Sequence, residues 1–270
     1  GNHIFNGNNI SNNSEFDHYL KRFGYTFKNE NRELGGYAIL KNKKISLIMD
    51  VGNSPNLNFS KDYQSGAMSF EIISNGKKLI TNCGYYDKKN IKLKQLSKST
   101  ATHSALSIDD HSICHFKKIN EHNLILNNEL KILKKNIVFE KKYWKINVSH
   151  NGYQKKYNLI HERDIEFYPE KNKFVGIDRI LNKQSNLNVK FDIRFHLEPT
   201  IKFMKTQDNK TILIELEDEG WKFTCDNFDI NIDNGLYFGN KNSYTENQNI
   251  FISGITSNQN ENINWELTKI

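Results

Sequence analysis

Short runs in which apolar and polar residues alternate fill the chain from Gly36 almost to its C-terminus. Such runs include residues 37–39, 45–51, 144–148, 174–180 and 189–196. A period of two places successive side chains on opposite faces of a strand, so each run is typical of a strand with one buried face. About fifteen to twenty such runs, with almost no helical pattern, predict an all-β fold: a large, layered antiparallel β-sandwich.

Residues 1–35 differ from the rest because they are polar and rich in Asn. Ser14 is a suitable N-cap for a short helix. One face of that helix would carry Glu15, Phe16, Tyr19 and Leu20. We therefore predict a short N-terminal helical connector, followed by one β domain over residues 36–270. The opening GNHIFNGNN resembles the middle of a protein, so we expect the chain to be a fragment of a longer one.

Composition excludes several classes of protein. The formal net charge of +7 comes almost wholly from Lys spread along the chain, which does not favour a dedicated nucleic-acid groove. No apolar run approaches the roughly eighteen residues of a membrane span. The three Cys are too few and too far apart for a disulfide framework or a zinc finger, so we expect small buried side chains. Common nucleophile, phosphate-loop and zinc-protease motifs are also absent.

The stretch from Asp62 to Asp110 concentrates the polar residues that suggest a site. Residues 67–73, 77–81 and 104–108 are predicted strands, and Asn75-Gly76 joins the first two because this pair readily forms a type I′ turn. Asn151-Gly152 and Asn234-Gly235 are predicted as turns on the same ground. Gln64, Asn82 and His103 lie at the strand junctions, so we expect a hairpin and a returning strand to bring them together.

The order of several segments resembles the C-terminal β domain of the heparinase II/III-like polysaccharide lyases, from about Asn6 to Trp265. The segments are YQSGAMSFEIISNGKKLITNCGYY, STATHSALSIDD, HNGYQKKYNLIHERDI, FDIRFHLEP and YFG. Enzymes of this family pair an N-terminal helical toroid with such a domain and cleave uronic-acid polysaccharides by β-elimination. The resemblance implies that residues 1–35 lead from a missing toroid, which would supply the main acid and base, and that this chain alone is nearly inactive.

The resemblance also implies a metal site, which this sequence alters. Family members often bind zinc through a His, an Asp and a second His, and the matching residues here are Gln64, Asn82 and His103. Amides are poor zinc ligands, and the anionic ligand is lost. The three residues could hold a hard cation weakly, but we expect a plain hydrogen-bonded triad and no bound cofactor.

Removing a proton from C5 of a uronate requires a base, a proton donor for the leaving oxygen, and groups that neutralise the carboxylate. His103 lies in the A-x-H-S segment and is the first catalytic candidate, although a buried His bonded to an amide is an equal alternative. Tyr86, which matches the family's G-x-Y turn, and Tyr85 are candidates for proton donation or sugar stacking. Their structural alternative is a pair of half-buried tyrosines at a strand end.

Three further residues are candidates for binding an acidic glycan. Arg194 and His196 occupy alternate positions, so they share one face of a strand. They could contact a carboxylate or sulfate of the ligand. The alternative is a structural pair within the sandwich. Arg163 and His161 present the same choice. Lys98 belongs to a Lys-rich loop that suits an acidic ligand or is simply a solvated surface.

These observations leave three hypotheses. The first is the C-terminal domain of a polysaccharide lyase that lines one side of the substrate cleft, with an acidic polysaccharide and the toroid of the same protein as its partners. The second is a non-catalytic carbohydrate-binding or scaffolding β-sandwich with a degenerate metal site. The third is a polyanion-binding surface without a true site. For the lyase we expect the periplasm or cell envelope of a bacterium.

Overall fold

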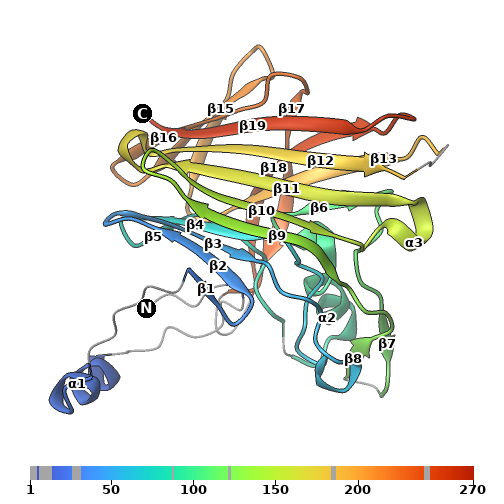
Figure 1. Ribbon diagram of the computed structural model, residues 1–270, viewed down its shortest axis with the longest axis horizontal. Helices are drawn as coiled ribbons and strands as arrows, with labels where there is room; N and C mark the ends of the chain where they lie inside the picture. The colour runs from blue at the N-terminus through green and yellow to red at the C-terminus, as the bar shows by residue number, and fades with distance from the viewer. Residues whose placement is uncertain are drawn as a thin grey trace.

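The structure is a computed structural model that describes residues 5, 14–25, 32–86, 88–120, 123–183, 187–239 and 244–270. Two large antiparallel sheets pack against each other, and a small hairpin lies beside them (Figure 1). The predicted layered β-sandwich is therefore confirmed. No helix within the described ranges has the length and apolar character needed to cross a bilayer.

The nine-stranded sheet has the order β1-β2-β3-β4-β5-β13-β18-β17, with β6 also paired to β13. Its strands are β1 (Glu33–Leu34), β2 (Tyr37–Lys41), β3 (Ile45–Asp50), β4 (Phe70–Ser74), β5 (Lys77–Thr81), β6 (Leu106–Ile108), β13 (Lys190–Leu197), β17 (Ile230–Tyr237) and β18 (Thr245–Ile255). This sheet thus combines strands from the N-terminal and C-terminal parts of the chain.

The eight-stranded sheet has the order β14-β15-β16-β19-β12-β11-β10-β9. Its strands are β9 (Ile132–Phe139), β10 (Trp144–His150), β11 (Leu159–Tyr168), β12 (Lys173–Asn182), β14 (Lys202–Lys205), β15 (Thr211–Leu216), β16 (Glu219–Thr224) and β19 (Glu261–Lys269). The small hairpin pairs β7 (Phe116–Lys118) with β8 (Leu124–Leu126). The helices are α1 (Ser14–Arg22), α2 (Ile91–Ser97) and α3 (Gln154–Tyr157), with short 3-10 turns at Leu57–Phe59, Thr100–Thr102 and Pro169–Lys171.

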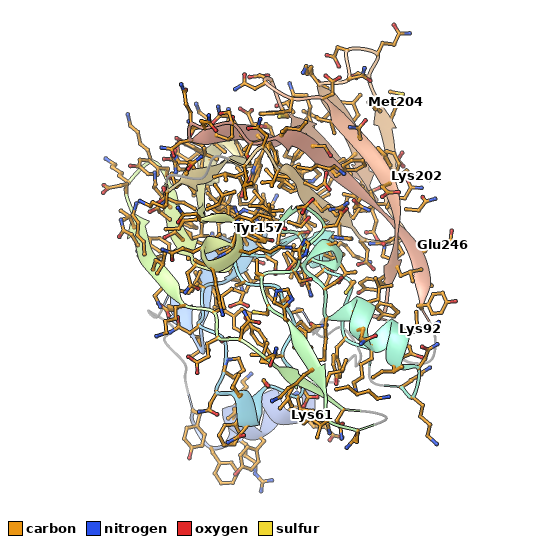
Figure 2. All side chains as sticks on the ribbon, turned by 90° about the vertical axis from the view of Figure 1, so that its right-hand side faces the viewer. Lys61, Lys92, Tyr157, Lys202, Met204 and Glu246 are labelled. Carbon is orange, nitrogen blue, oxygen red and sulfur yellow. The ribbon has the colours of Figure 1, made fainter. Side chains whose placement is uncertain are left out.

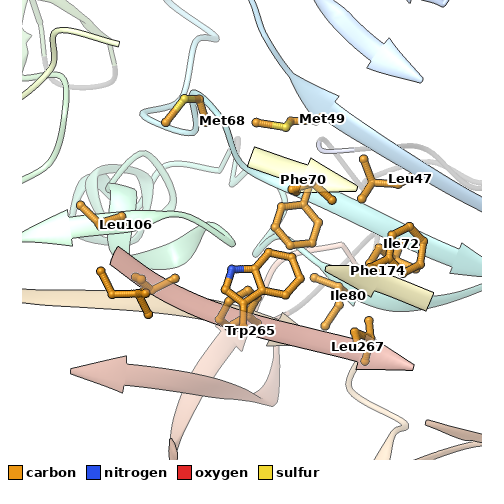
Figure 3. Close-up of a cluster of buried hydrophobic side chains, with 14 of the residues drawn as sticks. Leu47, Met49, Met68, Phe70, Ile72, Ile80, Leu106, Phe174, Trp265 and Leu267 are labelled. Carbon is orange, nitrogen blue, oxygen red and sulfur yellow. The ribbon is translucent and has the colours of Figure 1, made fainter. Parts of the chain in front are cut away.

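Aromatic side chains from both sheets meet in the core (Figure 3). Trp265 of β19 stacks on Phe70 of β4, with 5.7 Å between ring centroids, and meets Phe195 of β13 edge-on at 5.0 Å. Each of the three is at most 2% exposed. Burial of such large apolar surfaces between the layers is the main force that holds the sheets together.

Gly176 of β12 gives Trp265 its room, which leads to a stability prediction. The two residues are register partners, and a Cβ at position 176 would lie 2.0 Å from the indole ring. Gly176→Ala should therefore lower the free energy of unfolding by about 1–3 kcal/mol, because the ring must shift within a packed core. Urea unfolding measures this, with Gly52→Ala as control, since a Cβ there makes only ordinary contacts. Equal loss in both variants would contradict the prediction.

Three predictions made from short stretches of sequence are confirmed: the Asn75-Gly76 turn, the N-terminal helix and the burial of the Cys side chains. Asn75 and Gly76 have φ of 46° and 81°, and they join β4 to β5 as the type I′ turn predicts. The predicted helix forms as α1, and all three Cys are free and buried.

The turn predicted at Asn234-Gly235 is wrong, because both residues lie inside β17 and pair with β18. A Cβ at Gly235 would lie 2.6 Å from Oδ1 of Asn247, so Gly here provides space for a neighbouring amide. The strand predicted over residues 67–73 also starts later, at Phe70, since Met68 has a φ of 61°. Close tertiary packing, which a dipeptide signal cannot report, decides both positions.

Candidate functional site

Polar side chains cross the outer face of the nine-stranded sheet, on the side away from the core. Tyr37 pairs with Asp50 on β2 and β3, and Thr81, His196 and Asn249 are register partners on β5, β13 and β18. On each of these strands a neighbouring residue points inward and belongs to the core: Ala38, Met49, Ile80, Phe195 and Ile250. Figure 1 shows α2 and the β7–β8 hairpin on this outer side of the sheet. The outer face is therefore where a polar ligand could be met.

A cavity of about 120 Å³ lies at one end of this polar row. Its lining residues are Phe5, Tyr37, Asp50, Asp62, Tyr63, Gln64, Gly66, Ser69 and His103. Four buried polar atoms on its walls, Tyr63 Oη, Ser69 Oγ and both ring nitrogens of His103, have no hydrogen-bond partner among the described residues. Buried polar groups are usually paired, so unpaired atoms around one cavity indicate a place for a ligand, an ion or water.

The structure brings two of the three predicted junction residues to this cavity. Gln64 and His103 line it, whereas Asn82 does not. The Oδ1 of Asn82 accepts a hydrogen bond from the Ser104 amide at 2.8 Å, and its Nδ2 donates to Glu71 at 3.4 Å. Asn82 thus orders the loop that carries His103.

His103 is 1% exposed, and burial, reinforced by the nearby His196, lowers its pKa to about 3. Its imidazole is neutral at physiological pH and keeps a free lone pair for a ligand. A Cβ at Gly66 would lie 3.2 Å from the ring, so Gly at this position allows the loop to pass close to His103.

Asp50, Tyr63 and Ser69 line the cavity but were missed by the sequence prediction. Burial raises the pKa of the Asp50 carboxyl to about 7. Asp50 is the last polar position of the alternating run of residues 45–51, and it was a usable signal because the core face of that strand is apolar. Tyr63 and Ser69 carried no comparable signal.

Arg163 of β11 reaches from the opposite sheet to the loops around the cavity. Its Nη1 donates to the carbonyls of Met68 at 2.9 Å and Ser104 at 2.7 Å, and its Nε donates to Asp178 at 2.7 Å. His161 contacts the same Asp178 oxygen at 2.6 Å. Arg163 is fully buried, so it and His161 hold the loops in place rather than contact a substrate.

Arg194 and His196 share one strand face, as predicted, and both have structural contacts. Arg194 donates to Ser107 Oγ at 3.3 Å and lies 3.5 Å from the Asp192 carboxylate. His196 is 2% exposed, and its Nε2 is 3.0 Å from the Ala101 carbonyl. Arg194, with its side chain 15% exposed, is the one of the two that a ligand on the surface could contact.

The buried histidines predict how stability depends on pH. Burial lowers the pKa of His103 to about 3 and of His196 to about 4, from an ordinary value of 6.5, and those of His150 and His161 fall in the same direction. The unfolded chain therefore binds protons that the folded chain does not, so their contribution to stability is complete above pH 6.5 and is lost as pH falls. The raised pKa of Asp50 has the opposite effect, because the folded chain binds this proton more tightly and gains stability as pH falls below about 7. Four histidines oppose this single carboxyl, so we expect their effect to dominate.

We expect the free energy of unfolding to decrease from pH 6.5 to about 4.5, with a smaller slope in His196→Gln, which lacks one of the titrating groups. Urea unfolding at a series of pH values measures both slopes. A slope in His196→Gln equal to that of the unsubstituted chain would show that His196 does not contribute.

A second, basic pocket of about 470 Å³ adjoins the cavity through Asp62, which lines both. Its lining residues are Lys61, Asp62, Tyr85, Lys88, Lys89, Lys94 and Asn123. Tyr85 Oη donates to Asp62 Oδ1 at 2.8 Å, which fixes its ring at the boundary. Figure 2 places Lys61 at the end of the molecule opposite Lys202 and Met204. Four ammonium groups around one pocket favour an anionic ligand.

The remaining candidates, Lys98 and Tyr86, line neither the cavity nor the basic pocket. Lys98 is fully buried, its Nζ donates to the carbonyls of Lys61 and Tyr63, and burial lowers its pKa to about 8. Lys98 therefore holds the segment of residues 61–63, which lies between the cavity and the basic pocket. Tyr86 packs edge-on against Phe238, with 5.3 Å between ring centroids, and lines neither hollow.

The predicted metal set does not fit zinc. Within the described part of the chain, no three side chains of His, Cys, Asp or Glu are grouped so that they could hold a metal ion. Asn82 is committed to Ser104 and Glu71, which leaves Gln64 and His103 as the members that face the cavity. An imidazole and a single amide are too few donors for a tetrahedral zinc site.

Comparison with known proteins identifies the type of domain. The family model described as "Heparinase II/III-like, C-terminal" matches residues 30–266. The solved structure of heparan sulfate lyase HepC from Pedobacter heparinus is 13% identical, with a TM-score of 0.75 over 99% of this chain and 44% of that one. No curated protein sequence matches the chain.

Two further structures show the same fold. A structure of Heparinase III is 17% identical, with a TM-score of 0.72, and covers 99% of this chain and 44% of that one. The Heparinase III-BT4657 gene product is 12% identical, with a TM-score of 0.75 over 99% and 43% of the two chains. This chain therefore spans less than half the length of each of these structures.

Proposed function

Because this chain belongs to the heparinase II/III-like, C-terminal family, we propose that it is the domain of a polysaccharide lyase that lines one side of the substrate cleft. The substrate would be a uronic-acid-containing glycan, cleaved by β-elimination. One observation carries the proposal: a cavity with unpaired polar atoms and a basic pocket adjoin at Asp62 on the outer face of the sheet.

The cavity and the basic pocket suit different parts of such a substrate. The lysines of the basic pocket would bind carboxylate or sulfate groups. Neutral His103 would contact the sugar beside the scissile bond, where its ring can donate a hydrogen bond to developing negative charge in a water-poor cavity. Tyr85 lies at the boundary and is a better candidate than Tyr86 for stacking or proton donation.

The rest of the chemistry would come from a second domain. We propose that residues 1–35 connect to a helical toroid of the same protein, that residues 36–270 form the present domain, and that the toroid supplies the main acid and base. The enzyme would act in the periplasm or cell envelope of a bacterium, where extracellular polysaccharides are met. The isolated chain should then bind an acidic glycan without cleaving it at a useful rate.

The test is to incubate the full-length protein that contains this chain with alginate, heparan and chondroitin-type glycans. Release of unsaturated uronate, detected by its ultraviolet absorbance, is the expected result for at least one glycan. Its absence across the panel would overturn the lyase assignment.

A second function, a non-catalytic carbohydrate-binding domain, is favoured by one observation: Asn82 replaces a carboxylate and is bound to backbone and Glu71. Glycan binding by the full-length protein without any unsaturated product would select this function. Binding that falls steeply with salt and is unaffected by His103→Ala would instead indicate a diffuse polyanion-binding surface.

A further inference from the structure

Asp62 is the carboxylate at the boundary between the cavity and the basic pocket, because it lines both. It is an exposed residue, so a ligand that enters from solvent can contact it. No ion pair within the described part of the chain includes this carboxylate. The boundary therefore carries a negative charge in the middle of the surface on which we place the glycan.

The position of Asp62 is fixed from two sides. Tyr85 Oη donates to its Oδ1 at 2.8 Å, which orients the carboxylate. The Nζ of buried Lys98 donates to the carbonyls of Lys61 and Tyr63, so it holds the backbone on both sides of Asp62. The second carboxylate oxygen, Oδ2, is left as an acceptor for a ligand. Asp62 therefore presents a preorganised acceptor rather than a mobile surface charge.

The two sides of this boundary differ in charge. Four lysines line the basic pocket, where an anionic group is favoured. None of the described residues that line the cavity is Lys or Arg, and its one histidine, His103, is neutral at physiological pH. An anionic group at the boundary would therefore approach Asp62 closely without gaining a cation on the cavity side.

A carboxylate discriminates between the groups of an acidic glycan by their charge. A hydroxyl or an amide N–H donates a hydrogen bond to it, and such a charge-assisted bond is stronger than a neutral one. A sulfate or carboxylate at the same place offers no donor and is repelled, and contact between like charges is a common means of rejecting a wrong partner. The position of Asp62 therefore decides which part of a glycan can lie at the boundary.

We propose that Asp62 is a specificity-determining residue: it accepts a hydroxyl or amide donor of the glycan at the boundary and rejects a sulfate or carboxylate there. This inference rests on the proposed function, because it assumes that an acidic glycan lies across the cavity and the basic pocket. The favoured ligand places an anionic group in the basic pocket and an uncharged edge of the next sugar against Asp62. A glycan with anionic groups on every sugar would have to place one of them against this carboxylate.

The test compares two tetrasaccharides that differ only in sulfate: unsulfated chondroitin, and chondroitin sulfated on each hexosamine. Isothermal titration calorimetry with the 270-residue chain measures the dissociation constant of each. We expect Asp62→Asn to tighten binding of the sulfated tetrasaccharide at least about fivefold, because a like charge is removed, and to change binding of the unsulfated one less than about twofold. Asp62→Glu keeps the charge and should retain the discrimination of the unsubstituted chain. If Asp62→Asn fails to fold, Asp62→Ser replaces it, since Ser is also an uncharged acceptor.

Asp218→Asn is the matched control. It makes the same change of charge at an exposed residue, which lines a pocket with Lys202 at the end of the molecule opposite Lys61 (Figure 2). An equal gain for the sulfated tetrasaccharide in Asp218→Asn would show that net charge alone is responsible and would overturn the inference. Unchanged discrimination in Asp62→Asn would overturn it as well, while glycan binding itself would stand. If the unsubstituted chain binds neither tetrasaccharide, the proposed glycan-binding surface fails together with this inference.

Discussion

Arg163→Met should lower the free energy of unfolding by about 3–5 kcal/mol, because it removes one partner of a fully buried ion pair. Asp178 would keep contacts with His161 and with Trp265 Nε1 at 2.9 Å, but its charge would lose the guanidinium. The carbonyls of Met68 and Ser104 would lose their donor at the same time. Met has a similar volume and chain length, so most of the loss would be electrostatic.

Arg179→Met is the matched control for this prediction. Arg179 forms ion pairs with Glu162 at 3.0 Å and Asp164 at 3.5 Å, but its side chain is 25% exposed. Partly solvated pairs contribute little, so we expect a loss of no more than about 1 kcal/mol. Urea unfolding at neutral pH measures both variants. If the two losses are alike, Arg163 is not the residue that holds the two sheets and the cavity loops in register.

The second large effect concerns activity. In the full-length lyase, His103→Ala should reduce kcat/KM by about 100-fold or more, because a hydrogen-bond donor to the charge that develops beside the scissile bond is lost from a buried cavity. His115→Ala changes an exposed histidine and should leave the rate unchanged. Circular dichroism of both variants verifies the fold.

Initial rates of unsaturated uronate release give the comparison directly. The rate should fall at all glycan concentrations, since the lysines that bind the acidic groups remain. A variant that recovers full rate at high glycan concentration would show that His103 serves binding alone. An unchanged kcat/KM would remove His103 from the site.

The sequence predicts the architecture well because alternation is a local pattern with a global consequence. Runs such as residues 45–51 specify which face of a strand is buried, and enough of them require two packed layers. The Asn75-Gly76 turn is equally local, since its positive φ angles need no distant contact. These features could be read before any coordinates.

The site was only partly predictable, because its geometry depends on pairings between distant residues. Asp50 and His103 line one cavity although they are 53 positions apart, and no periodicity links them. Arg163 acts on that cavity from the opposite sheet, which no motif indicates. Asn82 occupied the right place in a family pattern, but its own hydrogen bonds turn it toward Ser104.

The central claim is that the cavity and the basic pocket form the wall on which an acidic glycan lies. Titration of a short uronic-acid oligosaccharide into the ¹⁵N-labelled 270-residue chain, followed by nuclear magnetic resonance, tests it most directly. We predict that the largest amide shifts occur at Asp62, Gln64, Tyr85 and Lys89, and that they shrink at high salt. Shifts confined to the opposite end of the molecule around Lys202, or no saturable shifts at all, would contradict the account.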